Sequence, residues 1–439
     1  MSAKRRLATN TLVNFVALGL NAIIQLAQVA VLTSVWSLER YGAWILLSTI
    51  PAYFALTDLG FSAAAQSDMT MSLARGDLAR ARATYQSTWA LMVLVSATVI
   101  FLTGAAVWLM NGHANSSNAV VSAIATQGWT AFLFVVYALV SLCARVVLAG
   151  FRAANLYATG TLIYEVSLFL ECWIMLGVAV AGGSFDDCVL AGIVSRVFWT
   201  IVKNVVLARQ QPELQLGFAA ASRAELRRIL KPALAAMATP ISLALNLQGI
   251  VVVIGYAVSP VAVAIFTPVR TLSRVGLQLA GTFNRATMPE VSRAASLDNS
   301  VTLRRLLVAT AASALLVLLP GAVLFAVVGQ SAVELWTHHR ISPPWLVVAL
   351  LGADMFVQGC WYFISNLLLS TNEHTRVALM TLVISLLSVV AAIPAGIHFG
   401  LTGVALTIVG GDLATLLAVL LTFRGSSIFR GAFRHAVQA

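Results

Sequence analysis

Charge is what this sequence has least of. Only 10% of its 439 residues are Asp, Glu, Lys or Arg, whereas a soluble domain carries about 25%, so the chain has too few charges to cover a surface exposed to water. Cysteines are also few, and none of the four, Cys143, Cys172, Cys188 and Cys360, belongs to a CxxC pair. We therefore expect no disulfide and no metal site.

Long apolar runs take the place of the missing charge. Hydrophobic residues make up 60% of the chain, and the mean hydropathy is +0.91. Windows of about 20 residues, the length of a helix that crosses a bilayer, predict twelve membrane-spanning helices. The predicted spans are 10–34, 41–65, 85–110, 120–149, 160–182, 188–208, 233–256, 261–283, 306–328, 345–369, 377–398 and 402–424.

The longest central polar break separates six predicted spans from six, so we expect an all-α polytopic membrane protein built from two six-helix bundles. Residues 1–208 would form the N-terminal bundle and residues 233–424 the C-terminal bundle. Residues 209–232 would form a cytoplasmic linker, and 425–439 a cytoplasmic tail. The order of turn, basic loop and span recurs in both halves, which indicates a pseudo-symmetric repeat.

The net charge of +11 follows the loops. With the N-terminus placed in the cytoplasm, 22 of the 27 Lys and Arg residues, Lys203 among them, fall on the inner side, and only Arg40 and Arg340 fall on the outer side. This positive-inside pattern predicts that both termini are cytoplasmic. It also predicts that the basic loops bind anionic lipid headgroups and not nucleic acid. In the linker, Ser222 and Glu225 match a capping box that predicts a short basic amphipathic helix.

Three arginines remain inside predicted spans: Arg196, Arg270 and Arg274. Arg270 and Arg274 are four residues apart and so share one helical face. Charges at this depth usually face protein or water, and two guanidinium groups on one face can bind a diphosphate bidentately. We interpret this pair as a candidate substrate site, with Arg196 as a third donor, while structural ion pairs with buried acids remain the alternative.

Five acidic residues also lie in the predicted spans: Asp58, Glu165, Glu171, Asp354 and Asp412. The first two fall near the inner boundary, where a gating or helix-end role is expected. The other three lie deeper, where desolvation lets a carboxyl group carry a proton. They are candidates for coupling transport to an H⁺ or Na⁺ gradient, and no other cofactor is expected.

Several segments resemble one family. The stretches VLTSVWSLERYGAWILLS (31–48), FALTDLGFSAAAQSDM (54–69), 256–283 and NRATMPEVS (284–292) are similar to the polysaccharide flippases, the O-antigen and exopolysaccharide transporters of the MATE-like multidrug/oligosaccharidyl-lipid/polysaccharide exporter superfamily. The resemblance implies two bundles around a central, often cationic, cavity in the bacterial cytoplasmic (inner) membrane. It also implies that a polyprenyl-diphosphate-linked oligosaccharide is moved from the inner to the outer leaflet, with polysaccharide polymerase and glycosyltransferases as partners.

Two other functions stay open. A multidrug antiporter of the same fold would favour an acidic cavity for cationic drugs, and the intramembrane arginines argue against one. A membrane-embedded glycan polymerase or glycosyltransferase would need a sizeable loop with catalytic groups, whereas the largest predicted outer loop is 329–344. We therefore expect no catalytic residues and no enzymatic activity.

Overall fold

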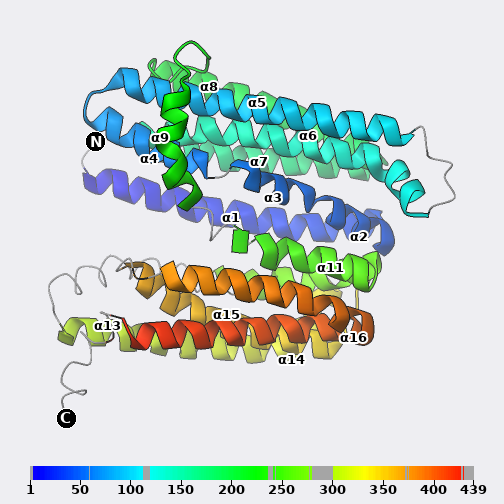
Figure 1. The fold of residues 1–439 in the computed structure, drawn as a ribbon. Coiled ribbons are helices and arrows are strands. Elements are labelled where there is room, and N and C mark those ends of the chain that lie inside the picture. The colour runs from blue at the N-terminus through cyan, green and yellow to red at the C-terminus, as the bar shows by residue number, and fades with distance from the viewer. Residues whose placement is uncertain are drawn as a thin grey trace. The chain divides into compact units, whose positions relative to one another are not determined.

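The computed structural model describes residues 3–58, 60–111, 119–235, 241–242, 244–275, 277–278, 300–370, 373, 375–426 and 429 (Figure 1). Within these ranges every regular element is a helix. Eight of the described helices are long and apolar enough to cross a membrane. The chain is a helical polytopic membrane protein, as its hydropathy predicts.

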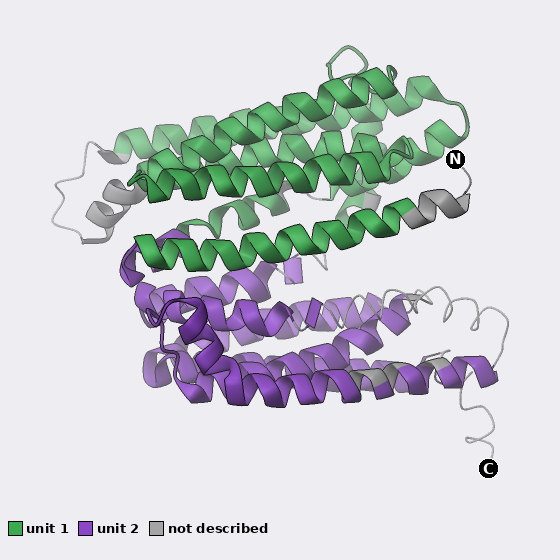
Figure 2. Ribbon diagram, turned by 180° about the vertical axis from the view of Figure 1, so that it is seen from behind, with its two compact units in different colours: residues 1–35, 47–240 green, residues 36–46, 241–439 purple. Residues whose placement is uncertain are grey.

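Two compact units make up the chain, residues 1–35 with 47–240 and residues 36–46 with 241–439 (Figure 2). The sequence-derived linker 209–232 thus belongs to unit 1, and the short segment 36–46 belongs to unit 2. Gly42 and Gly255 explain the second assignment. A Cβ on Gly42 would lie 1.9 Å from the Pro260 carbonyl oxygen, and one on Gly255 would lie 2.4 Å from Leu46, so only glycine permits these close contacts within unit 2.

Unit 1 is a bundle in which α6 packs on α5 and α8, and α7 packs on α1 and α8. Its interior is filled by apolar side chains such as Met69, Tyr85, Phe151 and Leu207, all fully buried. Its elements are α1 (Ala3–Val35), α3 (Ile50–Phe54), η1 (Ala55–Asp58), α4 (Phe61–Ala74), α5 (Leu78–Asn111), α6 (Ala119–Ala153), α7 (Tyr157–Val180), α8 (Phe185–Gln210) and α9 (Arg223–Ala235).

Unit 2 packs α15 between α14 and α16, and α16 also contacts α11. Residues 260–275 form a further helix, whose buried Phe266 joins Ile254 and Val348 in the core. The remaining elements are α2 (Leu38–Leu47), the π-helix η2 (Leu245–Gly249), α11 (Ile250–Ala257), α13 (Ser300–Ser313), the π-helix η3 (Ala314–Leu318), α14 (Leu319–Trp336), α15 (Trp345–Ser370) and α16 (Thr375–Arg424).

Within the described residues, the predicted spans differ from the observed helices at two places, and parts of the spans 233–256 and 261–283 lie outside those residues. Residues 41–65 do not form one span, because α2 ends at Leu47 and the chain is interrupted again by Pro51 at the start of α3 and by left-handed Gly60 (φ 72°) before α4. The predicted spans 377–398 and 402–424 lie in α16, where Gly400 (φ 59°, ψ −146°) breaks the helix between them. Of the predicted tail 425–439, residues 427–428 and 430–439 lie outside the described residues.

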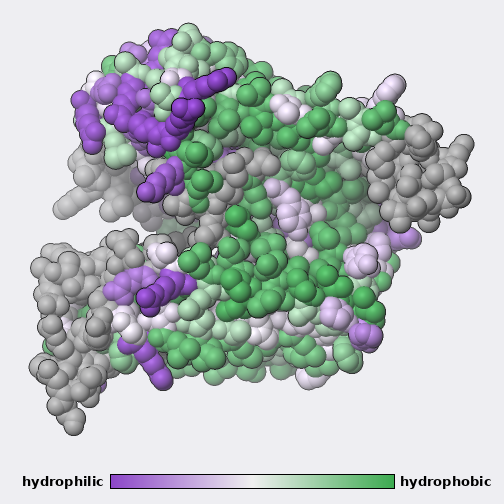
Figure 3. All heavy atoms as spheres, viewed as in Figure 1, coloured by the Kyte–Doolittle hydropathy of each residue, from purple (hydrophilic) through white to green (hydrophobic). Residues whose placement is uncertain are grey.

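The outer face of the helices is apolar. Figure 3 shows hydrophobic side chains over most of the long helices, with hydrophilic ones gathered near α9 and the adjoining helix ends. Phe101, Trp108 and Leu316 are each at least 74% exposed, which a protein in water would avoid. Lipid chains therefore cover these surfaces.

The predicted capping box in the linker is wrong. Ser222 Oγ accepts a hydrogen bond from the Ala224 amide at 3.2 Å, and the Glu225 carboxylate pairs with Arg228 instead of returning to the cap. Helix α9 nevertheless forms where the sequence predicts a basic helix, and it packs on α4 and α5 (Figure 1).

Candidate functional site

Arg270 lies on helix 260–275 and is held by a π-helix of the same unit. Its guanidinium Nη2 donates to the Asn246 carbonyl at 2.9 Å and to Asn246 Oδ1 at 2.7 Å, and its Nη1 donates to the Leu247 carbonyl at 3.2 Å. A π-helix shifts the backbone pattern to i→i+5, which turns carbonyl groups away from their usual partners. Arg270, only 8% exposed, satisfies the carbonyls of η2 with a fixed positive charge.

Arg274, one turn further along, is half-buried and lies near two acidic residues of unit 2. Asp354 on α15 interacts electrostatically with both arginines, and Asp412 on α16 interacts with Arg270. Asp354 and Asp412 also interact with each other, and Gln358 donates to Asp412 Oδ2 at 3.3 Å. The arginine pair and the two acids, which the sequence marked separately from each other, therefore form one cluster, the unit 2 charge cluster.

The unit 2 charge cluster differs from a set of simple ion pairs. The ion pairs between described residues, with nitrogen and oxygen within 4 Å, use the acids Asp68, Glu171 and Glu225. None of these acids belongs to the unit 2 charge cluster. Arg270 is bound by neutral oxygens instead. The positive charges of Arg270 and Arg274 are therefore not cancelled by direct contact with a carboxylate.

Arg196 of α8 lies in unit 1 and is part of a tight ion pair. Its Nε donates to Glu171 Oε2 at 2.7 Å and its Nη2 to Glu171 Oε1 at 2.5 Å, with 7% and 5% of the two side chains exposed. The Tyr137 hydroxyl donates to Glu171 Oε1 at 2.6 Å and also accepts from Arg196. The structural ion-pair alternative fits this pair better than a free substrate donor or a free proton carrier.

Lys203, which the sequence analysis counted on the inner side, is a buried charge of α8. Its side chain is fully buried, its Nζ lies 5.1 Å from the centroid of the Tyr164 ring, and that Nζ has no hydrogen-bond partner. The spacing of seven residues from Arg196 on α8 places both on one helical face, and this was the signal that could have identified Lys203.

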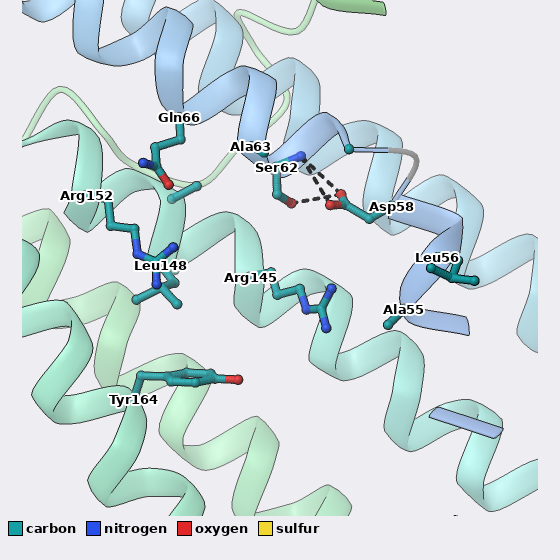
Figure 4. Close-up of a pocket in the computed structure, with 12 residues that line it drawn as sticks. Ala55, Leu56, Asp58, Ser62, Ala63, Gln66, Arg145, Leu148, Arg152 and Tyr164 are labelled. Carbon is teal, nitrogen blue, oxygen red and sulfur yellow. Dashed lines mark hydrogen bonds between the residues drawn. The ribbon is translucent and has the colours of Figure 1, made fainter. Parts of the chain in front are cut away.

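A pocket of about 370 Å³ opens within unit 1 between η1, α4, α6 and α7 (Figure 4). Arg145 and Arg152 of α6 and Tyr164 of α7 extend toward it, opposite Asp58. The Asp58 carboxylate accepts from the Ser62 amide at 3.1 Å and from the Ser62 hydroxyl at 2.8 Å, so it holds the start of α4.

Gly60 lines this pocket, and Glu165 follows the lining residue Tyr164 on α7. A Cβ on Gly60 would lie 2.3 Å from the Ala233 carbonyl oxygen, so a left-handed glycine is required where α9 approaches α4. Glu165 accepts from Asn21 Nδ2 at 2.7 Å. Asp58 thus holds a helix start and Glu165 bonds to α1, while their gating or coupling role near the inner boundary stays a prediction.

Metal binding has no support within the described ranges, because no three His, Cys, Asp or Glu side chains there come close enough together. No family model and no curated protein matches the chain. Solved structures do match it over its length. The chain has a TM-score of 0.74 and 15% identity to an inward-facing multidrug resistance MATE family transporter of the MOP superfamily, covering 100% of both chains.

The chain has the MATE fold. An outward-facing multidrug resistance MATE family transporter matches with a TM-score of 0.56 at 15% identity, over 95% of this chain and 96% of the other. A MOP superfamily transporter from Pyrococcus furiosus matches with a TM-score of 0.61 at 12% identity, over 99% and 97%. The MATE-like fold expected from the resemblance is confirmed, and the polysaccharide flippase family stays a prediction.

Proposed function

We propose that this protein is a transporter that moves a polyprenyl-diphosphate-linked oligosaccharide from the inner to the outer leaflet of the bacterial cytoplasmic membrane by alternating access. Its MATE fold supports transport, since structures of this fold are described in both inward-facing and outward-facing conformations. The observation that carries the choice of substrate is the unit 2 charge cluster, in which two arginines are near acids but paired with none.

The charge of the cluster favours an anion. Two neighbouring carboxylates repel each other when both are ionised, and in this proposal Asp354 and Asp412 hold one proton between them and carry one negative charge together. Arg270 and Arg274 carry two positive charges, because guanidinium groups stay protonated in proteins. The four residues therefore have a net positive charge in the apolar interior, where a diphosphate would be stabilised strongly.

The contacts of Arg270 and Arg274 indicate a different role for each arginine. Arg270 is engaged by three oxygens of Asn246 and Leu247, so its main role is to position helix 260–275 on the π-helix. Arg274 is more exposed and makes its electrostatic contact with Asp354, which leaves its guanidinium to bind the diphosphate. This division narrows the pair proposed from sequence to one principal ligand-binding residue.

The shared proton of the two carboxyl groups suggests how transport is coupled. When a diphosphate binds to Arg274, the electrostatic hold on Asp354 weakens, and a second proton is taken up more readily by the acid pair. Proton uptake and anion binding are then linked within unit 2. Glu171 is a weaker candidate for this role because its carboxylate is bound by Arg196 and Tyr137.

A multidrug antiporter is the second candidate, and the acid pair is the observation that favours it. Asp354 and Asp412 would attract a cationic drug if both lost their protons, and the MATE transporter described above is a multidrug resistance protein. The Pyrococcus furiosus transporter is described as having a binding pocket of reverse polarity that suggests a different function. The MATE fold therefore leaves the sign of the substrate charge to the residues of each protein.

Transport assays in proteoliposomes distinguish the two candidates. We expect the wild-type protein to move a fluorescent undecaprenyl-diphosphate oligosaccharide across the bilayer, measured as protection from a membrane-impermeant quencher. Arg274→Ala should slow this movement by at least about tenfold, the loss of one charge-assisted contact, while Arg274→Lys should restore part of it. Arg209→Gln, which removes an exposed charge at the end of α8, is the matched control.

Two results would contradict the proposal. One is unchanged oligosaccharide movement in Arg274→Ala. The other is ethidium transport that needs Asp354 and Asp412 in vesicles that do not move the oligosaccharide, which would establish the multidrug antiporter.

A further inference from the structure

The pocket of unit 1 is a second cationic site, separate from the residues used in the proposed function. Its walls come from η1, α4, α6 and α7, and it carries two arginines, Arg145 and Arg152, against one acid, Asp58 (Figure 4). The acid already accepts two hydrogen bonds from Ser62. The positive side of the pocket is therefore in excess.

Arg152 carries a buried hydrogen-bond donor that has no acceptor. Its Nε is buried without a hydrogen-bond partner, although a buried guanidinium donor normally has one. Its guanidinium carbon lies 5.6 Å from the centroid of the Tyr157 ring, and this cation–π contact orients the guanidinium group. It interacts electrostatically with Glu165, whose carboxylate accepts a hydrogen bond from Asn21.

The pocket lies toward the C-terminal end of α6. Arg152 lies in the last turn of α6, and Arg145 lies seven residues before it, or about 10 Å along the helix axis. The charged layer of a bilayer extends several Å beyond its hydrocarbon core. A phosphate group at the level of these two side chains would thus leave its hydrocarbon tail in the apolar region.

The remaining lining residues suit a phosphate ester on a lipid. Tyr164 and Gln66 supply neutral hydrogen-bonding groups, and Leu56 and Leu148 supply apolar contacts. The volume of about 370 Å³ is near the lower end of ligand pockets, about 300–1,000 Å³. It fits a headgroup and not an oligosaccharide.

We infer that this pocket binds the phosphate group of a membrane lipid, with Arg145 and Arg152 as the phosphate-binding residues. The phosphate could come from an anionic phospholipid such as phosphatidylglycerol or from a polyprenyl diphosphate, since both present the same charged oxygens. The inference concerns binding by unit 1 and holds whichever substrate the protein transports.

Binding is tested with the purified full-length protein in nanodiscs of phosphatidylcholine. Phosphatidylglycerol or undecaprenyl diphosphate is added, and the retained lipid is counted by native mass spectrometry. The wild type should retain at least one of the two, and Arg145→Gln with Arg152→Gln should weaken its retention by at least about tenfold. Arg209→Gln with Arg227→Gln removes two exposed charges of the same unit and should retain lipid like the wild type.

The two lipids distinguish the source of the phosphate. Preferred retention of phosphatidylglycerol supports a resident phospholipid, and preferred retention of undecaprenyl diphosphate, displaced by inorganic pyrophosphate, supports the carrier lipid. Equal retention by the pocket variant and the control variant would overturn the inference. If the double variant fails to fold, the single variants Arg152→Lys and Tyr164→Phe replace it, and each should weaken lipid retention. Unchanged lipid retention in both single variants overturns the inference as well.

Discussion

On α7 and α8 of unit 1, three buried charges form a bonded pair and an amine without a hydrogen-bond partner. Glu171 and Arg196 satisfy each other and share Tyr137, whereas the Lys203 amine has no hydrogen-bond partner. Removing one partner of a buried pair leaves an uncompensated charge and costs about 3–5 kcal/mol. Removing a charge that has no acceptor relieves a desolvation penalty instead.

These residues give opposite expectations for stability. Glu171→Ala should lower the melting temperature of the purified protein strongly, and Glu171→Leu with Arg196→Met should recover much of the loss because both charges are gone. Lys203→Met should leave the melting temperature unchanged or raise it. Melting followed by tryptophan fluorescence checks all three variants, and a destabilising Lys203→Met would show that the contact of the amine with the Tyr164 ring outweighs its desolvation.

At the scale of elements, the turn inside α16 depends on one backbone conformation. Gly400 has φ 59° and ψ −146°, a region that only glycine adopts readily. A Cβ at this position would meet no atom within 4 Å. The cost of any side chain there is therefore conformational and not steric.

Gly400→Ala should destabilise the protein by about 1–3 kcal/mol, the usual cost of a residue held in a sparsely populated backbone region. Gly410→Ala is the matched control, because Gly410 is helical and also has no atom within 4 Å of an added Cβ. The control should be neutral or slightly stabilising. Melting temperatures of the two variants decide the point, and an equal effect would remove the special role of the turn.

Helix α9 is fastened to unit 1 by a charged contact at Asp68. Arg228 donates to Asp68 Oδ2 at 2.6 Å, and Thr84 donates to the same oxygen at 2.7 Å. Burial raises the pKa of Asp68, but the hydrogen bonds and the charge of Arg228 outweigh it and hold the pKa below its usual value. The pKa of Arg228 is raised in turn by its hydrogen bond to Asp68.

The sign of the Asp68 shift predicts loss of stability in acid. A carboxyl group whose folded pKa is depressed contributes stability above its unfolded pKa, about 3.9, and loses it as the pH falls through the folded value. The wild type should therefore show a drop in melting temperature below about pH 4 that is smaller in Asp68→Asn. Identical pH profiles for the two proteins would show that Asp68 does not hold α9 in this way.

Hydropathy predicts the long helices because a bilayer selects for apolar windows whatever the tertiary contacts. It missed the interruption of 41–65, since Pro51 and Gly60 are single residues inside an otherwise apolar window. The partners of buried charges were not predictable either. Arg196 bonds to Glu171 because α7 and α8 pack together. Arg270 bonds to the carbonyls of Asn246 and Leu247 because these residues form a π-helix, which no local sequence pattern predicts.

At the scale of the whole molecule, the distribution of Lys and Arg predicts that both termini are cytoplasmic. A fluorescent protein that matures only in the cytoplasm, fused after Ala439, should be bright in cells. The same reporter inserted after Gly112, in the predicted outer loop between 85–110 and 120–149, should be dark. A dark C-terminal fusion that reaches the membrane would invert the assigned orientation.

The close contact of Gly42 with Pro260 also constrains how the protein is made. Helix α2 leaves the ribosome about 220 residues before the backbone on which it packs, and at roughly 5–20 residues per second that delay lasts about 10–45 s. Its glycine face must wait in the membrane without its final neighbour for that time. The order of synthesis and the order of assembly thus differ in this chain. Slowing translation after Val35 should therefore reduce the yield of folded protein less than releasing the chain from the ribosome before Pro260 is made.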